Sequence, residues 1–239
     1  GTGSGKFCRV ASVFEATPDS LTWINPNRKD KTALFENSNA GIIICLNEKV
    51  FIPKKNQVLI RCSNPKLIFT QILARVQSSQ NNPEIHKSAV IHPEAKIGKD
   101  VSIGPNVVIG KCTIGDATTI GANSVIRDNS ILGERVLIKP SAVIGGEGYG
   151  YVKHEDHQLK FPHIGGVLIE DDVHIGSQTC IDRGSLGYTK IGSHTKIDNL
   201  VHIAHNVIIG KNCNIIALSI IGGSTVIGNN TWISPSVSV

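Results

Sequence analysis

The chain has 239 residues, of which 40% are hydrophobic and 5% aromatic, and its formal net charge at pH 7 is +5. This composition is typical of a folded protein with an aliphatic core, and the modest positive charge, without a nucleic-acid-binding motif, favours no nucleic-acid partner. No apolar run reaches the eighteen or so residues of a membrane span, and the six cysteines lack CxxC spacing. We therefore expect a cytoplasmic protein without a secretory leader, with reduced thiols and no metal site.

Residues 1–80 predict a small α/β domain. The segments LTWI, GIIICL and QVLIRC have the length and apolar content of strands, and residues 30–37 are expected to form a short helix. The segment SNPKLIFTQILARVQ predicts a second helix, with Ser63 or Asn64 as its N-cap and Pro65 in its first turn. Its expected apolar face consists of Leu67, Ile68, Ile72, Leu73 and Val76.

Residues 81–239 carry a six-residue repeat. Isoleucine recurs at every sixth position from Ile191 to Ile233, and a small or β-branched residue stands four places after each one. A period of six fits neither an α-helix nor a simple strand alternation, but it fits a solenoid whose short strands turn a corner once per hexad. Earlier in the chain the same bulky position is occupied by Ile85, Ile91, Ile97, Ile103, Ile109, Ile114, Ile120, Ile126, Leu132, Ile138 and Ile144.

Three hexads close one triangular coil of eighteen residues. In such a coil the bulky side chain points into the prism, the small residue packs beside it near the corner, and successive coils stack at the strand spacing of about 4.8 Å. The sequence therefore predicts a mainly β fold, a left-handed parallel β-helix preceded by the small α/β domain. The repeat stops in mid-hexad at Val239, so we expect further coils in the complete protein.

Two interruptions break the repeat. Between Ile144 and Ile169 the hexads give way to GGEGYGYVKHEDHQLKFPHIGG, so residues 146–166 are expected to leave the wall of the prism as a loop. Between Ile181 and Ile191 the spacing grows by four residues. Loops that leave a rigid scaffold are common positions for functional sites.

The most polar part of the repeat is KIDNLVHIAHNV, which is the best candidate site in the sequence. With eighteen residues per coil, Gly223 is expected to lie directly above His205 in the next coil. A glycine leaves its backbone N–H approachable, as an oxyanion donor requires, and imidazole is the side chain best suited to exchange protons near neutral pH. The pattern thus stacks a potential base beneath a potential oxyanion donor.

Several of these strings resemble one enzyme family, the UDP-3-O-acylglucosamine N-acyltransferases of lipid A biosynthesis. The matching strings are FPHIGGVLIEDDVHIG, TCIDRGSLG and KIDNLVHIAHNVIIG, with GEGYG upstream and IIGGST downstream. They cover most of residues 85–239, and VASVFEATPDSLTWI resembles part of the family's small uridine-binding domain. The resemblance implies transfer of a 3-hydroxyacyl chain from acyl carrier protein to the 2-amino group of UDP-3-O-acylglucosamine, without a cofactor, by a bacterial cytoplasmic homotrimer with sites between its subunits.

The resemblance also assigns roles to individual residues. It implies that His205 is the general base, that Gly223 is the oxyanion donor, and that Trp23 and Asn25 bind the nucleotide. His202 departs from the glutamine usual in the family and is similar to the histidine of the related UDP-N-acetylglucosamine O-acyltransferases. The implied substrate-binding residues are Asp198, Asn199, His202, Asn206, Phe161 and His163.

Other functions remain open at this point. The chain is also compatible with another nucleotide-amino-sugar N-acyltransferase that uses acyl-CoA or acyl carrier protein, or with a catalytically silent scaffold. A trimeric zinc enzyme of the γ-carbonic anhydrase type needs three converging imidazoles, and His202 with His205 supplies only two. Asp182 and Arg183 fit either a substrate clamp or an ion pair that steadies the four-residue insertion.

Overall fold

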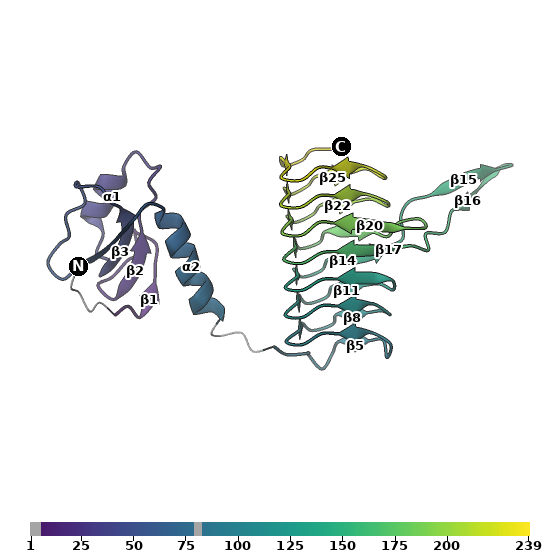
Figure 1. The fold of residues 1–239 in the computed structure, drawn as a ribbon, viewed down its shortest axis with the longest axis horizontal. Helices are drawn as coiled ribbons and strands as arrows, with labels where there is room; N and C mark the ends of the chain where they lie inside the picture. Colours follow the sequence, from purple (N-terminus) through teal and green to yellow (C-terminus); the bar gives the residue numbers. More distant parts are fainter. Residues whose placement is uncertain (1–5, 79–82) are drawn as a thin grey trace. The chain divides into compact units, whose positions relative to one another are not determined.

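The computed structural model describes residues 6–78 and 83–239, and the chain divides into two units, Gly1–Asn81 and Asn82–Val239 (Figure 1). The predicted boundary between residues 80 and 81 lies outside the described residues.

Within residues 6–78, the small unit is a four-stranded parallel sheet with two helices. Two separate apolar cores form because alternate residues of the central strand point to opposite faces of the sheet. Ile43 and Cys45 pack on one face with Phe35 of the first helix, and Ile42 and Ile44 pack on the other. The elements are β1 (Arg9–Val10), β2 (Ser20–Trp23), α1 (Lys31–Asn37), β3 (Ile42–Leu46), β4 (Val58–Cys62) and α2 (Pro65–Ser78), and the sheet order is β1-β2-β3-β4.

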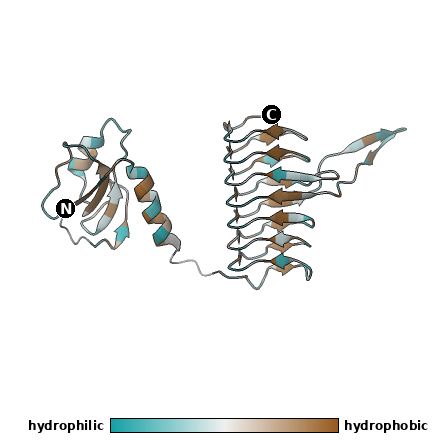
Figure 2. Cartoon of the chain, viewed as in Figure 1, coloured by the Kyte–Doolittle hydropathy of each residue, from teal (hydrophilic) through white to brown (hydrophobic). Residues whose placement is uncertain are grey.

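The helix α2 begins where the sequence predicts, but its buried face differs from the predicted one. The Asn64 side chain accepts a hydrogen bond from the Leu67 backbone N–H at 3.0 Å, which makes Asn64 the N-cap. The α2 residues that pack against the core of the small unit are Ile68, Phe69 and Ile72, which lie on one side of the helix because they are three and four residues apart. The predicted face members Leu67, Leu73 and Val76 are instead exposed. Figure 2 shows the resulting apolar and polar stripes along α2.

The second unit is a triangular prism of stacked coils, and it confirms the predicted mainly β fold. Three parallel sheets of seven strands each form its faces. The first sheet contains β7 (Ser102–Ile103), β10 (Thr119–Ile120), β13 (Leu137–Ile138), β18 (His174–Ile175), β21 (Lys196–Ile197), β24 (Asn214–Ile215) and β27 (Trp232–Ile233). The second contains β5 (Val90–Ile91), β8 (Val108–Ile109), β11 (Val125–Ile126), β14 (Val143–Gly146), β19 (Cys180–Asp182), β22 (His202–Ile203) and β25 (Ile220–Ile221). The third contains β6 (Lys96–Ile97), β9 (Thr113–Ile114), β12 (Ser130–Leu132), β17 (Gly166–Ile169), β20 (Tyr188–Ile191), β23 (Ile208–Ile209) and β26 (Val226–Ile227).

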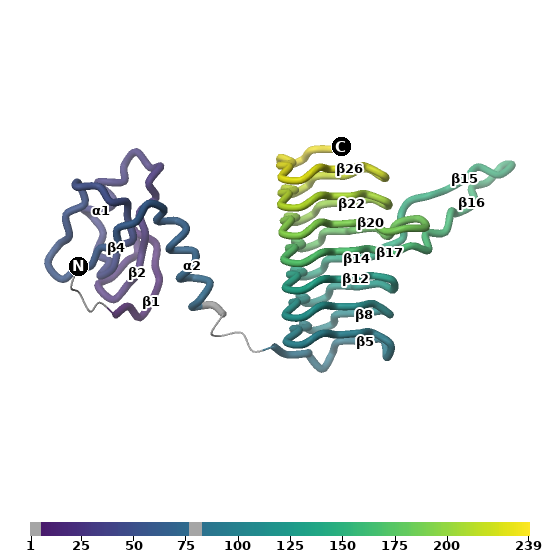
Figure 3. The backbone as a smooth tube through the Cα atoms, viewed as in Figure 1, coloured from purple at the N-terminus to yellow at the C-terminus, as the bar shows by residue number. Residues whose placement is uncertain are grey.

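Residues 146–166 leave the wall as predicted, but they are more regular than a loop. After β14 the chain forms an antiparallel hairpin, β15 (Tyr151–His154) with β16 (His157–Lys160), and it rejoins the prism at β17 (Figure 3). All eight strand residues of this hairpin are exposed.

The interior of the prism is a column of isoleucine and leucine side chains, with small residues beside them. Where the small residue is Thr or Ser, its hydroxyl bonds to the next coil: Thr118 donates to the Gly133 carbonyl and accepts from the Val136 N–H, each at 3.1 Å. Ser130 is an exception, because its buried Oγ has no partner. The carbonyl that would face it by this spacing belongs to Gly145, and the Arg183 side chain bonds that carbonyl instead.

At most corners the chain makes a tight turn in which the third residue after the bulky position adopts a left-handed conformation. Asn106, Asn123 and Asn206 have φ values of 57°, 60° and 61°, and asparagine tolerates this region better than most residues. The hexad between Ile109 and Ile114 is one residue short, and its corner contains no left-handed residue. The deletion therefore removes the turn residue and leaves both flanking strands in register.

Because the two residues of each short strand face opposite ways, substitutions at Ile209 and Ile208 should differ in their effect. Ile209 is 2% exposed in the prism, whereas Ile208 beside it is 42% exposed. We expect Ile209→Ala to lower the free energy of unfolding by about 2–5 kcal/mol and Ile208→Ala by less than about 1 kcal/mol, as measured by urea denaturation. Equal losses would contradict the assignment of the inward position.

Candidate functional site

The irregular segments of the β-helix all lie along one corner of the prism. We call the corner that joins the second sheet to the third the 2–3 edge. The hairpin segment between β14 and β17 and the four-residue insertion between β19 and β20 both lie on it. So do the turn that contains His205, between β22 and β23, and the turn that contains Gly223, between β25 and β26. Four successive coils thus bring these segments together.

His205 and Gly223 are stacked as the eighteen-residue coil predicts. The strands that precede them pair in register, with His202 opposite Ile220. A Cβ atom at position 223 would lie 2.9 Å from Cε1 and 3.0 Å from Nε2 of His205, so only glycine lets the backbone approach the ring this closely. Gly223 is exposed, and its N–H donates no hydrogen bond within the described part of the chain. A free N–H beside an imidazole is an arrangement that can stabilise a developing oxyanion.

Asn206 is fully engaged by neighbours within the chain. Its Oδ1 accepts from the Ser185 N–H at 2.9 Å, and its Nδ2 lies 2.9 Å from Ser185 Oγ and 3.1 Å from His205 Nδ1. Ser185 belongs to the four-residue insertion, so this insertion holds the residue that follows His205.

His163 is a second histidine of the site. It is 4% exposed, and its ring centroid lies 4.9 Å from that of His205. Its Nδ1 lies 3.1 Å from the Phe161 carbonyl oxygen. Side chains at Gly148 or Gly150 would contact the His163 ring at 2.8–2.9 Å, which explains the glycines of the GEGYG string. The hairpin segment therefore returns to place His163 against His205, while Phe161 remains 42% exposed beside it.

Asp182 is the acidic residue of this cluster, and sequence analysis did not place it there. Its Oδ2 lies 3.7 Å from His202 Nε2, and its side chain is 14% exposed. Burial raises the pKa of the Asp182 carboxyl, and the nearby His202, His205 and His163 oppose that rise. The four side chains thus form one electrostatic group.

Arg183 does not pair with Asp182. Its guanidinium donates to the carbonyls of Gly145 and Asp128, at 2.9 Å and 3.3 Å, and so ties the insertion to the coils below. The ion pair that the IDRG string suggested is absent from the described residues. Arg183 therefore has the steadying role, and Asp182 is free to face the histidines.

Asp198 and Asn199 lie at a different corner, between the first and second sheets. Asp198 accepts a hydrogen bond from the Asn199 N–H, and Asn199 accepts one from the Ser177 N–H, both at 2.8 Å. One face of the prism separates them from His205. Within one copy of the chain, the structure therefore does not bring these two predicted residues to the site.

Three further features bear on the predicted function classes. Among the residues described, no group of three or more His, Cys, Asp or Glu side chains is arranged to hold a metal ion. The six cysteines are unpaired, and Cys213 is fully buried in the core position that the hexads predict. In the described ranges, no helix is long and apolar enough to cross a membrane.

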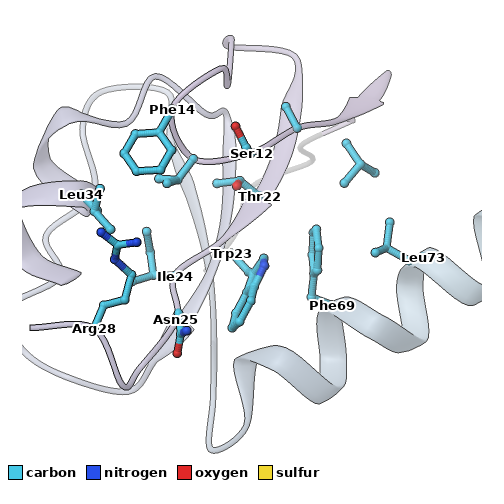
Figure 4. A pocket seen from close by; sticks show the side chains of 13 residues that line it. Ser12, Phe14, Thr22, Trp23, Ile24, Asn25, Arg28, Leu34, Phe69 and Leu73 are labelled. Carbon is cyan, nitrogen blue, oxygen red and sulfur yellow. The ribbon is translucent and has the colours of Figure 1, made fainter. Parts of the chain in front are cut away.

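The small unit has a cavity of its own, of about 500 Å³. Trp23 stacks on Phe69 with ring centroids 5.9 Å apart, and Figure 4 shows Asn25 on the opposite side of the indole. Thr22 also lines the cavity, and its Oγ1 is buried without a hydrogen-bond partner. The cavity lining consists of Val10, Ala11, Ser12, Val13, Phe14, Thr22, Trp23, Ile24, Asn25, Arg28, Leu34, Phe69 and Leu73.

Comparison with known proteins identifies what the β-helix is similar to. Over 81 residues the chain is 56% identical to a UDP-3-O-acylglucosamine N-acyltransferase of Fusobacterium nucleatum, which covers 34% of this chain and 24% of that protein. Over 107 residues it is 46% identical to the same-named protein of Methylorubrum populi, covering 45% of this chain and 30% of that protein. The predicted resemblance is confirmed. The match spans less than a third of the length of these relatives.

Family models and solved structures agree with a left-handed parallel β-helix of the hexapeptide type. Residues 188–223 match the model for bacterial transferase hexapeptide (six repeats), and residues 79–148 match that for the GMPPB C-terminal domain. A UDP-N-acetylglucosamine acyltransferase from Bacteroides fragilis superposes with a TM-score of 0.51 and 29% sequence identity, covering 65% of this chain and 67% of that one.

The raised pKa of Asp182 leads to a pH-dependent prediction. Because its pKa is higher in the folded protein than in the unfolded chain, folding is favoured while the carboxyl is protonated and loses this advantage as the pH rises through the folded pKa. We therefore expect Asp182→Asn to match the wild type in stability in acid and to be more stable in mildly alkaline buffer. Urea unfolding across this pH range measures the difference.

Asp156→Asn is the matched control for this experiment. The Asp156 carboxylate lies 3.5 Å from His157 Nδ1, but its side chain is 98% exposed, and such surface pairs contribute little to stability. We therefore expect its substitution to change stability much less than Asp182→Asn. If the free energy of unfolding of the wild type rose relative to that of Asp182→Asn as the pH increased, the pKa of Asp182 would not be raised in the folded protein.

Proposed function

We propose that this protein is an acyltransferase that moves a 3-hydroxyacyl chain from acyl carrier protein to the 2-amino group of UDP-3-O-acylglucosamine, a step of lipid A biosynthesis. The observation that carries the proposal is the His205 imidazole stacked beneath the free N–H of Gly223, on the edge where both insertions converge. The names of the relatives and their 46–56% identity over the matched residues support the substrate class.

In the proposed reaction, the amine attacks the thioester carbonyl while His205 accepts the proton that the nitrogen loses. A C–N bond forms, and the carbonyl oxygen gains negative charge beside the Gly223 N–H. When the tetrahedral intermediate collapses, the C–S bond breaks and the protonated His205 returns the proton to the departing thiolate. The thioester supplies the driving force, so the reaction requires no cofactor.

The remaining cluster residues would shape the sugar and acyl site. Phe161 offers an exposed aromatic face, and His163 and His202 offer ring nitrogens around Asp182. We assign these three residues to substrate binding, as the family resemblance implies. Asn206, with its amide already engaged by Ser185 and His205, is better suited to hold the base than to bind substrate.

A homotrimer would complete this site. Asp198 and Asn199 lie a full prism face away from their own His205, so their proposed contact with substrate requires a second copy of the chain. Exposed apolar side chains on the outer faces and corners of the prism are available for such packing. They include Leu200, Ile208, Leu218, Ile220 and Val226.

We also place the reaction in the bacterial cytoplasm. Both relatives named above come from bacteria, and three of the six unpaired cysteines are buried in apolar cores, as is usual for proteins of a reducing compartment.

The direct test is acyl transfer by the complete protein, followed by mass spectrometry of the UDP-sugar. Loss of the proposed base in His205→Gln should lower the rate by about 10²–10⁴. His92→Gln is the control, because His92 is an exposed histidine in a 2–3 edge turn several coils away. A His205→Gln protein as active as the His92→Gln protein would remove the proposed base.

The acceptor is tested in the same assay. His202 and the similarity to a UDP-N-acetylglucosamine acyltransferase favour, as a second candidate, O-acylation of a sugar hydroxyl. UDP-3-O-acylglucosamine and UDP-N-acetylglucosamine are therefore supplied separately, each with acyl carrier protein or acyl-CoA as donor. Product from the hydroxyl acceptor alone would replace the N-acyltransferase assignment.

We further propose that the cavity of the small unit binds the uridine of the substrate. Trp23 lines the cavity between Phe69 and Asn25, and Asn25 and Arg28 supply polar groups. The unpartnered Thr22 hydroxyl offers a buried hydrogen bond. A concave, mainly apolar site with a few placed polar groups is typical of small-molecule binding.

Removal of the proposed stacking face should weaken nucleotide binding. Base stacking on an aromatic ring contributes about 1–3 kcal/mol, so Trp23→Leu should raise the Kd for UDP roughly tenfold to a hundredfold. Trp23 and Trp232 are the two tryptophans of the chain, and Trp232 is 65% exposed on the β-helix. In a Trp232→Phe background, indole fluorescence therefore reports on Trp23 alone. Unchanged fluorescence on UDP addition, with an unchanged Kd in Trp23→Leu, would place the nucleotide elsewhere.

A further inference from the structure

The carboxamide of Asn206 has only one acceptable orientation. Its Oδ1 faces the backbone N–H of Ser185 at 2.9 Å, and a backbone N–H is always a donor. Rotation of the amide by half a turn would place its NH₂ group against that N–H, so that two donors would face each other. The NH₂ group therefore points to Ser185 Oγ and to His205 Nδ1, at 2.9 Å and 3.1 Å.

This orientation determines the tautomer of His205. An amide NH₂ can only donate, so His205 Nδ1 must accept and cannot carry a proton. In the neutral ring the proton then resides on Nε2. Of the two ring nitrogens, Nε2 is the one closer to the position that a Cβ atom at Gly223 would occupy, at 3.0 Å against 3.4 Å for Nδ1. A neutral imidazole has one donor nitrogen and one acceptor nitrogen, and the hydrogen bond to one of them assigns the other.

His163 is held in the opposite tautomer. Its Nδ1 lies 3.1 Å from the Phe161 carbonyl oxygen, which can only accept. The proton of His163 must therefore reside on Nδ1, and its Nε2 keeps a lone pair. The two rings, 4.9 Å apart, thus carry their protons on different nitrogens.

We propose that Asn206, oriented by the Ser185 N–H, is a positioning residue that holds His205 in the Nε2–H tautomer in the substrate-free protein. The functional meaning of this tautomer rests on the acyl transfer proposed above. A ring that already carries a proton on Nε2 cannot accept another there, so His205 becomes a base at Nε2 only when its proton moves to Nδ1. Substrate binding must therefore displace the Asn206 hydrogen bond from Nδ1, and the base is latent until it does.

The test reads the tautomers directly, by long-range ¹H–¹⁵N NMR of the ¹⁵N-histidine-labelled full chain at a pH where the rings are neutral. In Asn206→Asp the carboxylate still accepts from Ser185 and also offers an acceptor to Nδ1–H, so His205 should change to the Nδ1–H tautomer. In Asn206→Gly the side chain is removed, the left-handed backbone with φ of 61° is preserved without strain, and the preference for either tautomer should be lost.

His163 is the internal control, because its Phe161 partner is untouched in all three proteins and its Nδ1–H pattern should persist. A merely structural role of Asn206 would leave the pattern of His205 unchanged. The proposal is overturned if wild-type His205 shows the Nδ1–H pattern, or if Asn206→Gly keeps the wild-type one. The NMR measurement needs no substrate, so it is independent of the acyl-transfer assay. If the protein transferred no acyl group but wild-type His205 showed the Nε2–H pattern, the proposed function would be refuted and the tautomer assignment would stand.

Discussion

The in-register stacking of coils is the constraint on which the rest of the β-helix depends. Each short strand forms its backbone hydrogen bonds only with the strands directly above and below, so every coil fixes the position of the next. The isoleucine column then fills the prism because the same face of each strand points inward in every coil. Stacking also converts a distance along the sequence into a contact in space, and this is how His205 comes to lie under Gly223.

The candidate site lies where this stacking is interrupted. A one-residue insertion within a strand would turn the following side chains of that strand to the opposite face, whereas an insertion at a corner leaves the strands on both sides unchanged. Both long insertions occupy the 2–3 edge. Among the described residues of the prism, one buried hydroxyl, that of Ser130, has no hydrogen-bond partner, and the carbonyl that would face it, that of Gly145, accepts from Arg183. The insertions bring His163 to His205 and Ser185 to Asn206.

The sequence predicted those features that depend on local periodicity. The six-residue period predicted the fold, the positions of the extruded segments and the stacking of Gly223 over His205, because each needs only the repeat length. It did not predict that Asp182 faces three histidines, since this depends on where Arg183 points after an irregular turn. Sequence analysis also grouped Asp198 and Asn199 with His205, since all three belong to consecutive hexads. In one copy of the chain they lie at different corners, because consecutive hexads turn different corners of the prism. The helix face was misassigned for a related reason: helical spacing allowed two overlapping apolar stripes, and only the sheet beneath selects Ile68, Phe69 and Ile72.

The corners have a consequence for how such a chain can change. Partners one coil apart are separated by 17 residues for Lys96 and Thr113, 18 for Val125 and Val143, 22 for Cys180 and His202, and 37 for Val143 and Cys180. Two residues can thus be stacked partners in adjacent coils whatever the number of residues in the chain between them. Insertions and deletions at a corner therefore leave stacked residues side by side. A motif of fixed spacing would fail to recognise sites whose residues still superpose in three dimensions.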